Sequence, residues 1–354
     1  MNNKAIIAMS GGVDSSAAAY LMKEKGFDII GVTLKLFDND DAGIREKTCC
    51  SLADVEDAKS VAKRLGIRHY TFNFKDDFRE QVISRFIDAY EHCRTPNPCI
   101  DCNRYIKFKR LNERAAELGY DYVVTGHYAR IEEENGRFLL KRGLDSWKDQ
   151  SYVLYSMTQE QLKHTLLPLG GMTKAEVREV AEAQGFINAK KHDSQDICFV
   201  PDGDYAGFIE RYTGNEYQNG DFVDLDGNVL GEHKGIIRYT IGQRKGLGLS
   251  LPKPMYVCRV NPADNTVILG DDADLFSKSL DASDINLIAT DRLDAPVNVT
   301  AKVRYSQTAA PARVWQTGED ELHVEFAEPQ RAITPGQAVV LYDGDTVVGG
   351  GVIK

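Results

Sequence analysis

A segment rich in glycine and serine near the start of the chain has the residues needed to hold a phosphate group. It reads Ser-Gly-Gly-Val-Asp-Ser-Ser over residues 10–16. Two glycines allow a sharp turn whose N–H groups approach a ligand closely. The serines can cap the helix that follows, and the N-terminus of that helix favours an anion. The Walker pattern, Gly-Lys-Ser/Thr, and the Rossmann pattern, G-x-G-x-x-G, are both missing. The segment therefore predicts a phosphate loop of a different type.

Two of the seven cysteines stand in a segment that favours thiol chemistry. Cys99 and Cys102 follow two prolines, which keep this stretch out of regular structure. Residues 94–110 contain five lysines or arginines and a single acid, Asp101. Positive charge, or the N-terminus of the helix expected over 104–118, lowers the pKa of a thiol. We therefore expect Cys102, immediately before that helix, to be rich in thiolate.

A further cysteine, Cys198, lies in the polar run 193–199. Beside a phosphate loop, two suitable thiols predict sulfur transfer, in which one thiol carries a persulfide and the other resolves the product by thiol–disulfide exchange. A zinc site on Cys99 and Cys102 fits poorly, because no second CxxC or histidine pair accompanies them. An iron–sulfur cluster on Cys99, Cys102 and Cys198 stays open as an alternative. The remaining cysteines are expected only to pack: Cys49, Cys50, Cys93 and Cys258.

Alternating strand and helix signals over the first 125 residues predict the elements that position these groups. Apolar runs indicate strands, and helical spacing of apolar residues indicates helices. This order predicts an α/β fold with a doubly wound, mostly parallel sheet, which binds ligands at the carboxyl ends of its strands. The loops after the first and fourth strands are thus the expected site. The expected strands are 5–9, 29–34, 70–74 and 122–125, and the expected helices are 15–25, 52–65, 78–90 and 104–118.

The later part of the chain changes character. A hairpin is expected over 131–140, because Asn135-Gly136 separates its two arms. A helix is expected over 174–184, followed beyond residue 215 by short β segments. From about 278 the apolar residues alternate, which predicts a small all-β barrel. We expect a catalytic domain over 1–204, a small central domain over 205–274 and a C-terminal β-barrel over 275–354.

The charge of the chain is acidic overall but unevenly spread. The 354 residues carry 43 basic and 53 acidic side chains, a net charge of −10, which argues against a general nucleic-acid binder. Residues 201–354 hold 14 basic and 23 acidic side chains, a net of −9, and residues 1–200 hold the remaining −1. Two local stripes, 94–110 and 234–253, are basic and suit an RNA backbone. No run of 18 apolar residues and no signal peptide is seen, so we expect a cytoplasmic protein without a membrane span.

Residues 10–16 resemble the SGGxDS loop of the PP-loop ATP pyrophosphatases, which cleave ATP between the α and β phosphates and adenylate an oxygen atom. Six more segments narrow the resemblance to one family of these enzymes, the bacterial tRNA 2-thiouridylases. The C-terminal part matches it more weakly, through 304–306 and 335–337. The seven motifs occupy residues 8–16, 48–58, 95–103, 125–131, 148–155, 192–200 and 239–249.

The resemblance implies that the chain uses MgATP to adenylate the C2 oxygen of the wobble uridine in the tRNAs for lysine, glutamate and glutamine. Cys102 is then the nucleophile and Cys198 the persulfide carrier, supplied by a cysteine desulfurase or a sulfur-relay protein, in a monomeric enzyme. Asp14 is the expected magnesium contact. The implied ATP contacts are Ala8, Met9, Ser10, Gly11, Gly12, Val13, Asp14, Ser15, Leu34 and Gly126. The implied contacts with the target base are Asn97, Pro98 and Cys99, and those with the rest of the tRNA are His127, Lys148, Asp149, Gln150, Arg304, Tyr305 and Gln337.

One position departs from part of the family. Some members have an aspartate, proposed as a general acid/base, where this chain has Cys99. That proton-transfer role does not carry over to Cys99, and Asp101 and Asp193 are the alternative candidates. Two other classes of protein share the phosphate loop: an amide-forming synthetase fed by a glutaminase, and an RNA-binding module that retains ATP. Conversion of ATP to AMP that depends on tRNA separates the three.

Overall fold

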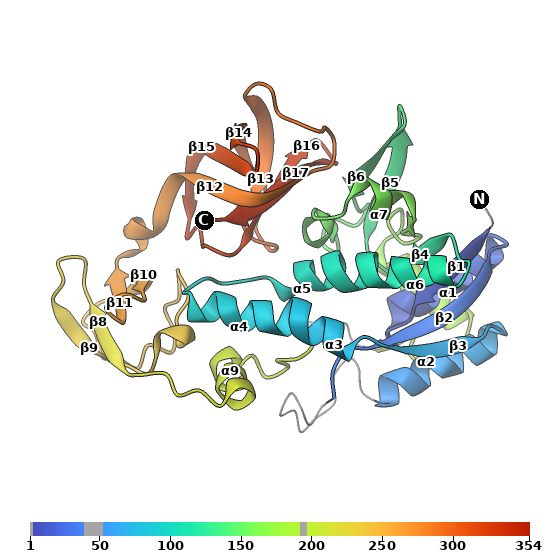
Figure 1. The fold of residues 1–354 in the computed structure, drawn as a ribbon, viewed down its shortest axis with the longest axis horizontal. Helices are drawn as coiled ribbons and strands as arrows, with labels where there is room; N and C mark the ends of the chain where they lie inside the picture. Colours follow the sequence, from blue (N-terminus) through green and yellow to red (C-terminus); the bar gives the residue numbers. More distant parts are fainter. Residues whose placement is uncertain (1–2, 39–51, 192–196) are drawn as a thin grey trace. The chain divides into compact units, whose positions relative to one another are not determined.

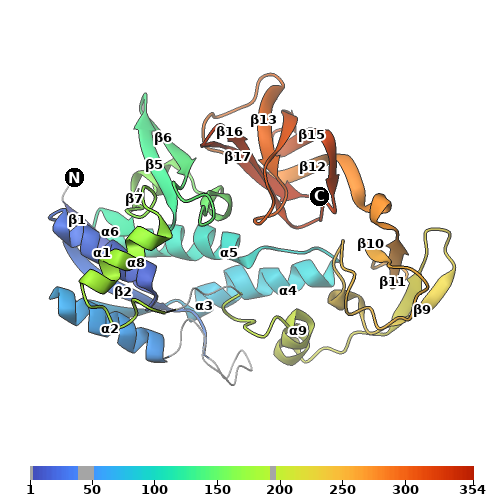
Figure 2. The same cartoon turned by 180° about the vertical axis from the view of Figure 1, so that it is seen from behind.

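The computed structural model describes residues 3–38, 52–191 and 197–354 (Figures 1 and 2). Cys49, Cys50 and Asp193 lie outside the described residues. The chain divides into two compact units. The first unit comprises Met1–Ile83, Pro98–Gly203 and Gly344–Val348, and the second comprises Ser84–Asn97, Asp204–Asp343 and Gly349–Lys354.

A five-stranded parallel sheet forms the centre of the first unit, in the order β3-β2-β1-β4-β7. The predicted doubly wound α/β sheet is therefore confirmed. Strand order reverses beside β1, which makes the gap between the carboxyl ends of β1 and β4 the expected ligand site in such a sheet. The strands are β1 (Lys4–Ala8), β2 (Asp28–Lys35), β3 (His69–Asn73), β4 (Tyr122–Val124) and the two-residue β7 (Thr165–Leu166), which the sequence did not suggest.

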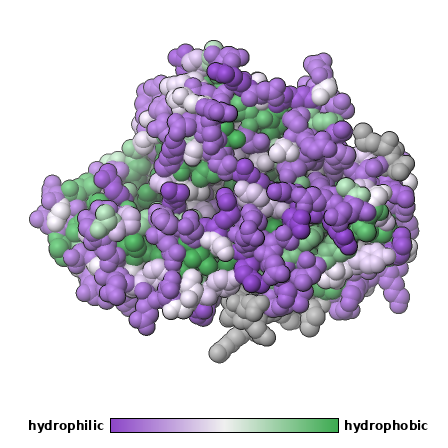
Figure 3. Space-filling model, viewed as in Figure 1, coloured by the Kyte–Doolittle hydropathy of each residue, from purple (hydrophilic) through white to green (hydrophobic). Residues whose placement is uncertain are grey.

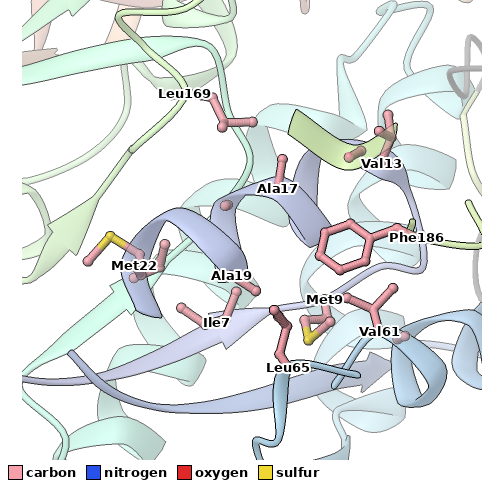
Figure 4. Packing of buried hydrophobic residues seen from close by; sticks show 14 of the residues in the cluster. Ile7, Met9, Val13, Ala17, Ala19, Met22, Val61, Leu65, Leu169 and Phe186 are labelled. Atoms are coloured by element: carbon pink, nitrogen blue, oxygen red, sulfur yellow. The ribbon is translucent and has the colours of Figure 1, made fainter. Parts of the chain in front are cut away.

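Helices α1 (Val13–Glu24) and α2 (Leu52–Leu65) pack against this sheet, and α8 (Lys174–Ala183) packs against α1. Consecutive alanines of α1, Ala17, Ala18 and Ala19, are fully buried, because small side chains let the helix approach its neighbours closely. Figure 4 shows this cluster, in which side chains of β1, α1 and α2 meet Phe186 from the segment after α8. The core thus fixes the start of α1, where the phosphate loop ends.

Two helical stretches begin earlier than expected. The helix expected over 78–90 is α3 (Lys75–Phe78), the π-helical η1 (Arg79–Ile83) and α4 (Ser84–Glu91) in succession. The helix expected over 104–118 starts at Pro98, a residue suited to a first helical turn. It consists of α5 (Pro98–Asp101), the π-helix η2 (Cys102–Arg110) and α6 (Leu111–Glu117). Cys102 therefore lies within a helix rather than before one.

The predicted hairpin is confirmed as β5 (Ala129–Glu134) and β6 (Arg137–Arg142). Asn135 and Gly136 at its tip have φ of 52° and 80°, as a type I′ turn requires. The remaining short elements of the first unit are η3 (Ser151–Leu154) and α7 (Gln159–Lys163).

The second unit holds a small sheet and a barrel. The small sheet has the order β10-β11-β8-β9, and its core contains Phe222, Tyr239 and Val257. Six strands in the order β12-β15-β14-β13-β16-β17 close into a barrel through the pairing of β12 with β17, which confirms the predicted C-terminal β-barrel. The bounds are β8 (Gly220–Val223), β9 (Val229–His233), β10 (Tyr256–Asn261), β11 (Thr266–Gly270), β12 (Phe276–Leu287), β13 (Val297–Lys302), β14 (Ala310–Gly318), β15 (Glu321–Arg331), β16 (Ala338–Asp343), β17 (Thr346–Ile353), α9 (Tyr205–Thr213), η4 (Ile236–Arg238) and η5 (Asp272–Leu275).

Hydrophilic residues cover most of the face seen in Figure 3. Within the described part of the chain, no helix has the length and apolar character needed to cross a membrane.

Candidate active site

A cavity of about 220 Å³ opens at the carboxyl ends of the central strands in the first unit. Residues of the loops after β1 and β4 line it, as expected for a doubly wound sheet. Seven of the expected ATP contacts lie on its wall: Ala8, Met9, Ser10, Asp14, Ser15, Leu34 and Gly126. Gly11, Gly12 and Val13 complete the loop between them. His127 and Gln150, expected to contact tRNA, line the same cavity, together with Lys107 and Thr125, which sequence reasoning did not single out.

Gly11 gives the phosphate loop its shape. Its φ is +76°, and a Cβ atom there would lie 2.3 Å from the backbone oxygen of Asp54. Both the left-handed backbone and this close approach require glycine. The serines do not cap α1 as expected. The Ser15 and Ser16 hydroxyls instead donate to the carbonyl of Gly12 at 3.0 Å each, and no side chain caps the helix at Gly12. The first turn of α1 thus presents backbone N–H groups to an anion.

The loop after β4 lies directly against the start of α1. A Cβ atom at Gly126 would be 2.8 Å from the carbonyl carbon of Asp14 and 2.9 Å from the backbone nitrogen of Ser15. A larger residue at this position would push the two loops apart. The glycine of the segment 125–131 is therefore needed for the cavity to form.

The Asp14 carboxylate forms an ion pair with a lysine that no local sequence motif predicts. Lys174 Nζ lies 2.7 and 2.8 Å from the two carboxylate oxygens of Asp14, and the Tyr128 hydroxyl donates to Oδ1 at 2.7 Å. The Lys174 side chain is only 11% exposed. It is the first residue of α8, whose start is fixed by a capping box between Thr173 and Glu176. A phosphate loop without its own lysine thus gains one from 160 residues away.

A second brace holds the outer side of the loop. Asn188 Nδ2 donates to the Gly11 carbonyl and to the Ser16 hydroxyl, both at 2.9 Å. Lys191 Nζ donates to the same carbonyl at 3.3 Å, and it pairs with Asp54 at 2.5 Å and Asp57 at 2.8 Å. The carbonyl of Gly11 therefore accepts from two side-chain donors, Asn188 and Lys191. The segment after α8 thus fixes the backbone of the phosphate loop.

The β4 side of the cavity carries a neutral histidine. His127 is buried, and its Nδ1 hydrogen-bonds with Thr125 Oγ1 at 2.7 Å. Burial, and then the charge of Lys107, hold the pKa of His127 well below its usual range. A neutral ring can donate or accept one hydrogen bond on the cavity side, but it carries no charge for a phosphate.

The expectation of a lowered pKa for Cys102 is wrong. Cys102 is buried, at 8% exposure, and burial raises the pKa of its thiol to about 11. Lys107 lowers that pKa, whereas Cys99 and Asp101 raise it further. The local excess of positive charge is visible in the sequence, but most of it points to solvent, because Lys109 and Arg110 are exposed. Loss of water around the sulfur outweighs the remaining charge.

Cys198 occupies a different environment in the same unit. It is partly exposed, and one residue separates it from the segment 192–196, which lies outside the described residues. The next residue, Phe199, is buried and packs edge-on against Phe78 of α3, with ring centroids 5.8 Å apart. Because α3 also contacts η2, Phe199 attaches the cysteine segment to the helical layer that carries Cys102.

Cys99 is exposed on α5, one turn before the buried Cys102. In the described part of the chain, no three histidine, cysteine or acidic side chains come together in an arrangement that could hold a metal ion. Cys99, Cys102 and Cys198 all belong to that part, so their geometry does not favour the iron–sulfur alternative.

The Lys148-Asp149-Gln150 segment is tied into the protein. Asp149 Oδ1 accepts from the backbone N–H groups of Gly143 and Ser151, at 3.1 and 3.0 Å. Gln150 Oε1 accepts from the backbone of Tyr128 at 3.0 Å. The acid and the amide thus organise the turn that ends at the cavity, in addition to any contact with RNA.

The remaining expected tRNA residues belong to the second unit. Gln337 Nε2 donates to the Thr95 carbonyl at 2.7 Å, two residues before Asn97. Arg304 hydrogen-bonds with the Thr334 hydroxyl at 3.2 Å, and Tyr305 is 40% exposed. A Cβ atom on Gly242 would lie 3.6 Å from both Arg304 and Arg331. The basic stripe 234–253 therefore meets two barrel arginines, of which Arg331 was not expected.

Comparison with known proteins extends over the whole chain. Three family models match in succession: a tRNA methyl transferase HUP domain at residues 3–202, a tRNA methyl transferase PRC-barrel domain at 206–271 and an aminomethyltransferase beta-barrel domain at 277–353. A solved 4-thiouridine synthetase in complex with RNA and ATP is 21% identical, with a TM-score of 0.39, over 59% of this chain and 53% of its own.

Three curated relatives are each named tRNA-specific 2-thiouridylase MnmA or MnmA 1. The protein from Clostridioides difficile is 54% identical over 100% of this chain and 99% of its own length. Those from Caldanaerobacter subterraneus and Clostridium acetobutylicum are 52% and 51% identical, over 100% of this chain and 98% and 100% of theirs. The model descriptions mention methyl transfer, but the relatives that span the full chain carry one consistent name. Because about half of its residues are identical to those of relatives that match it over its whole length, the chain belongs to the family of tRNA-specific 2-thiouridylases.

Proposed function

We propose that this protein is a tRNA-uridine 2-sulfurtransferase that replaces the C2 oxygen of the wobble uridine with sulfur at the expense of ATP. One observation carries the proposal: the cavity built by the phosphate loop has a wall residue, Lys107, in the same π-helical segment, η2, as the buried Cys102. A nucleotide site and a thiol are thereby joined through one rigid element. Full-length relatives with this name support the same activity.

Adenylation is the first half of the proposed reaction. The uridine C2 oxygen attacks the α-phosphorus of ATP, the bond to the β-phosphate oxygen breaks, and pyrophosphate leaves. The phosphate loop contributes oriented N–H groups at the start of α1, where charge develops. Gly11, Gly12 and the residues from Ala8 to Ser15 are the proposed ATP contacts on this side, with Leu34 and Gly126 on the other walls.

Magnesium fits the donor chemistry of this cavity. Mg²⁺ in proteins is usually held by one or two carboxylates together with substrate phosphates, and Asp14 places a carboxylate on the cavity wall. When bound, the ion neutralises the departing pyrophosphate. In the protein itself Lys174 balances the charge of Asp14, and the same carboxylate would hold the metal.

Sulfur transfer is the second half. The terminal sulfur of a Cys198 persulfide forms a bond to C2, and the C2–O bond breaks with its electron pair leaving on AMP. The Cys102 thiolate then attacks Cys198 sulfur and releases 2-thiouridine, so that the two thiols become a disulfide that an external dithiol must reduce. The partly exposed Cys198 suits a thiol that must accept sulfur from a cysteine desulfurase or a sulfur-relay protein.

The tRNA must bring an extruded base to the cavity, because a stacked base hides its reacting atom. We assign the base contact to Asn97, Pro98 and Cys99, with Asp101, in the same short helix as Cys99, as a candidate for proton transfer. His127, Lys148, Asp149 and Gln150 in the first unit are proposed tRNA contacts. Arg304, Tyr305 and Gln337 are the proposed contacts in the second unit, and we add Arg331 beside Gly242.

We further propose domain limits at 204 and 274, a monomeric enzyme and a cytoplasmic location.

Nucleoside mass spectrometry of unmodified tRNA, incubated with the protein, MgATP, a cysteine desulfurase and cysteine, tests the function. We expect 2-thiouridine to form together with AMP and pyrophosphate, and only in the presence of tRNA. Asp14→Ala should block pyrophosphate release. ATP conversion without tRNA, or an unchanged nucleoside profile, would contradict the proposal.

A further inference from the structure

Lys107 joins the nucleotide cavity to the cysteine helix, and neither motif contains it. It is half-buried and lies on the cavity wall. Among the described residues that line the cavity it is the one with a cationic side chain, since His127 is neutral there. A cavity that receives a nucleotide, with several negative charges, therefore offers a single wall cation.

The π-helical winding of η2 gives Lys107 its position relative to Cys102. In a helix with i→i+5 hydrogen bonds, residue i+5 lies a little more than one turn beyond residue i, on the same side of the helix. In an α-helix, at 3.6 residues per turn, residue i+5 would be rotated away by about 140°. Because η2 begins at Cys102, π-helical winding places Lys107 on the same side of the helix as Cys102. Straight α-helical winding would turn one of the two away from the other.

The charges around Cys102 show that this placement matters for the sulfur. Burial disfavours the thiolate most strongly, and Cys99 and Asp101 disfavour it further. Lys107 is the group that favours it. The Lys107 ammonium thus serves two groups that are anionic during the reaction: a nucleotide phosphate in the cavity and the Cys102 thiolate at the start of η2.

We propose that Lys107 is a shared catalytic cation, which binds the α-phosphate while the nucleotide occupies the cavity and turns to the Cys102 thiolate when AMP leaves. This inference rests on the proposed function. Its consequence is an order of events. Cys102 stays protonated while the adenylated base is present, so that it does not consume the Cys198 persulfide early. It ionises once the cavity is empty, and its proton ends on the released 2-thiouridine.

The test combines two measurements on the full-length protein and on three variants. Lys107→Met removes the charge at similar length, Lys107→Arg keeps it, and Lys109→Met removes an exposed charge two residues further along the same helix. Equilibrium dialysis gives the affinity for AMP and ATP. Mass spectrometry of the Cys102 peptide gives its rate of alkylation by iodoacetamide, with and without saturating AMP. Thermal melting verifies that each variant is folded.

We expect Lys107→Met to weaken AMP and ATP binding by about 10- to 100-fold, as for a lost charged hydrogen bond. The same variant should slow Cys102 alkylation about tenfold, since one pKa unit changes the thiolate fraction tenfold. Lys107→Arg should restore both properties, and Lys109→Met should change neither.

AMP itself distinguishes a shared cation from simple obstruction. Obstruction would slow alkylation of the wild-type and Lys107→Met proteins by the same factor. A shared cation predicts a further slowing of about tenfold in the wild-type protein alone, because only there does AMP withdraw the charge from the sulfur. Equal factors in the two proteins would overturn the inference. Failure of the wild-type protein to bind AMP or ATP would instead count against the proposed nucleotide site.

Discussion

The phosphate loop and the cysteine helix contribute to one cavity, but they are prepared for chemistry in opposite ways. The loop is held in its working shape before any ligand arrives: Gly11 fixes its turn, and Asn188 and Lys191 hold its carbonyl. The helix keeps Cys102 in its protonated, weakly nucleophilic form, because burial raises the pKa of the thiol to about 11.

This difference matches what each region must bind. A preformed anion site costs little, since backbone N–H groups carry no net charge and the loop needs no ionisation. A permanently ionised thiol would be open to oxidation and to early reaction with a persulfide. A rigid, preformed phosphate loop therefore suits ATP binding, whereas a Cys102 thiol that ionises only at the right step suits the nucleophile. The following predictions test whether the two regions can be disabled separately.

The largest effect is expected at the cysteines. Cys102→Ser and Cys198→Ser should each reduce 2-thiouridine formation by at least about a thousandfold, as for a lost nucleophile. Pyrophosphate release that depends on tRNA should continue in both, because the loop is intact, and tRNA binding should survive. Cys258→Ser, in β10 of the second unit, is the matched control and should leave thiolation unchanged. Retained 2-thiouridine in either of the first two variants would refute the sulfur-transfer step.

Gly11→Ala should damage the loop and spare the helix. Its Cβ would lie 2.3 Å from the Asp54 carbonyl, so we expect pyrophosphate release to fall about a hundredfold, as when a catalytic donor is misplaced. Gly119→Ala provides the control, since Gly119 has nearly the same φ, +75°, with nothing within 4 Å. That variant should lose only about 1–2 kcal/mol of stability from the left-handed backbone. Equal losses of activity in both would show that the close contact is unimportant.

Lys174→Met should weaken the loop more mildly. It leaves the partly buried carboxylate of Asp14 without its ammonium partner, and we expect pyrophosphate release to fall about 10- to 100-fold. Lys190, the exposed neighbour of Lys191, offers a control as Lys190→Met. Alkylation of Cys102 should stay at the wild-type rate in both variants. A normal rate of adenylation in Lys174→Met would mean that this ion pair only stabilises the fold.

The effect that is smallest per step is a dependence of Cys102 alkylation on pH. Because burial raises the thiol pKa to about 11, Cys102 is protonated at neutral pH, and its thiolate fraction grows as the pH rises. Its alkylation rate in the nucleotide-free protein should increase about tenfold per pH unit between pH 7 and 10. Peptide mass spectrometry at each pH measures this rate. A plateau below pH 9 would show that the thiol ionises more readily than its burial indicates.

Most of the fold follows from local sequence. Helix α2 begins and ends where the spacing of its apolar residues predicts, and strands β1 to β3 lie within about one residue of expectation. The hairpin at Asn135-Gly136 follows from the one turn type these two residues favour. Element β7 was missed because two residues are too few for a periodic pattern, and the π-helical segments were missed because apolar spacing resembles that of an α-helix.

The candidate site likewise contains residues that local sequence predicts and residues that it does not. The phosphate loop, Gly126 and the cysteines are recognisable from residue type and short-range spacing, since each is a local arrangement of backbone and functional group. Lys174, Asn188, Lys191 and Lys107 are not, because an isolated lysine or asparagine on a helix or a turn is ordinarily a surface residue. Their roles depend on neighbours between 5 and 180 residues away along the chain.

The sequence by itself determined the kind of chemistry: a phosphate loop without a lysine, reactive cysteines and an α/β sheet to position them. Only the tertiary structure decided the electrostatic state of those groups. It supplied Asp14 with a lysine from α8, and it reversed the expected direction of the Cys102 pKa. The physical reason is that charge counted along a chain ignores desolvation and orientation, both of which exist only after the chain has folded.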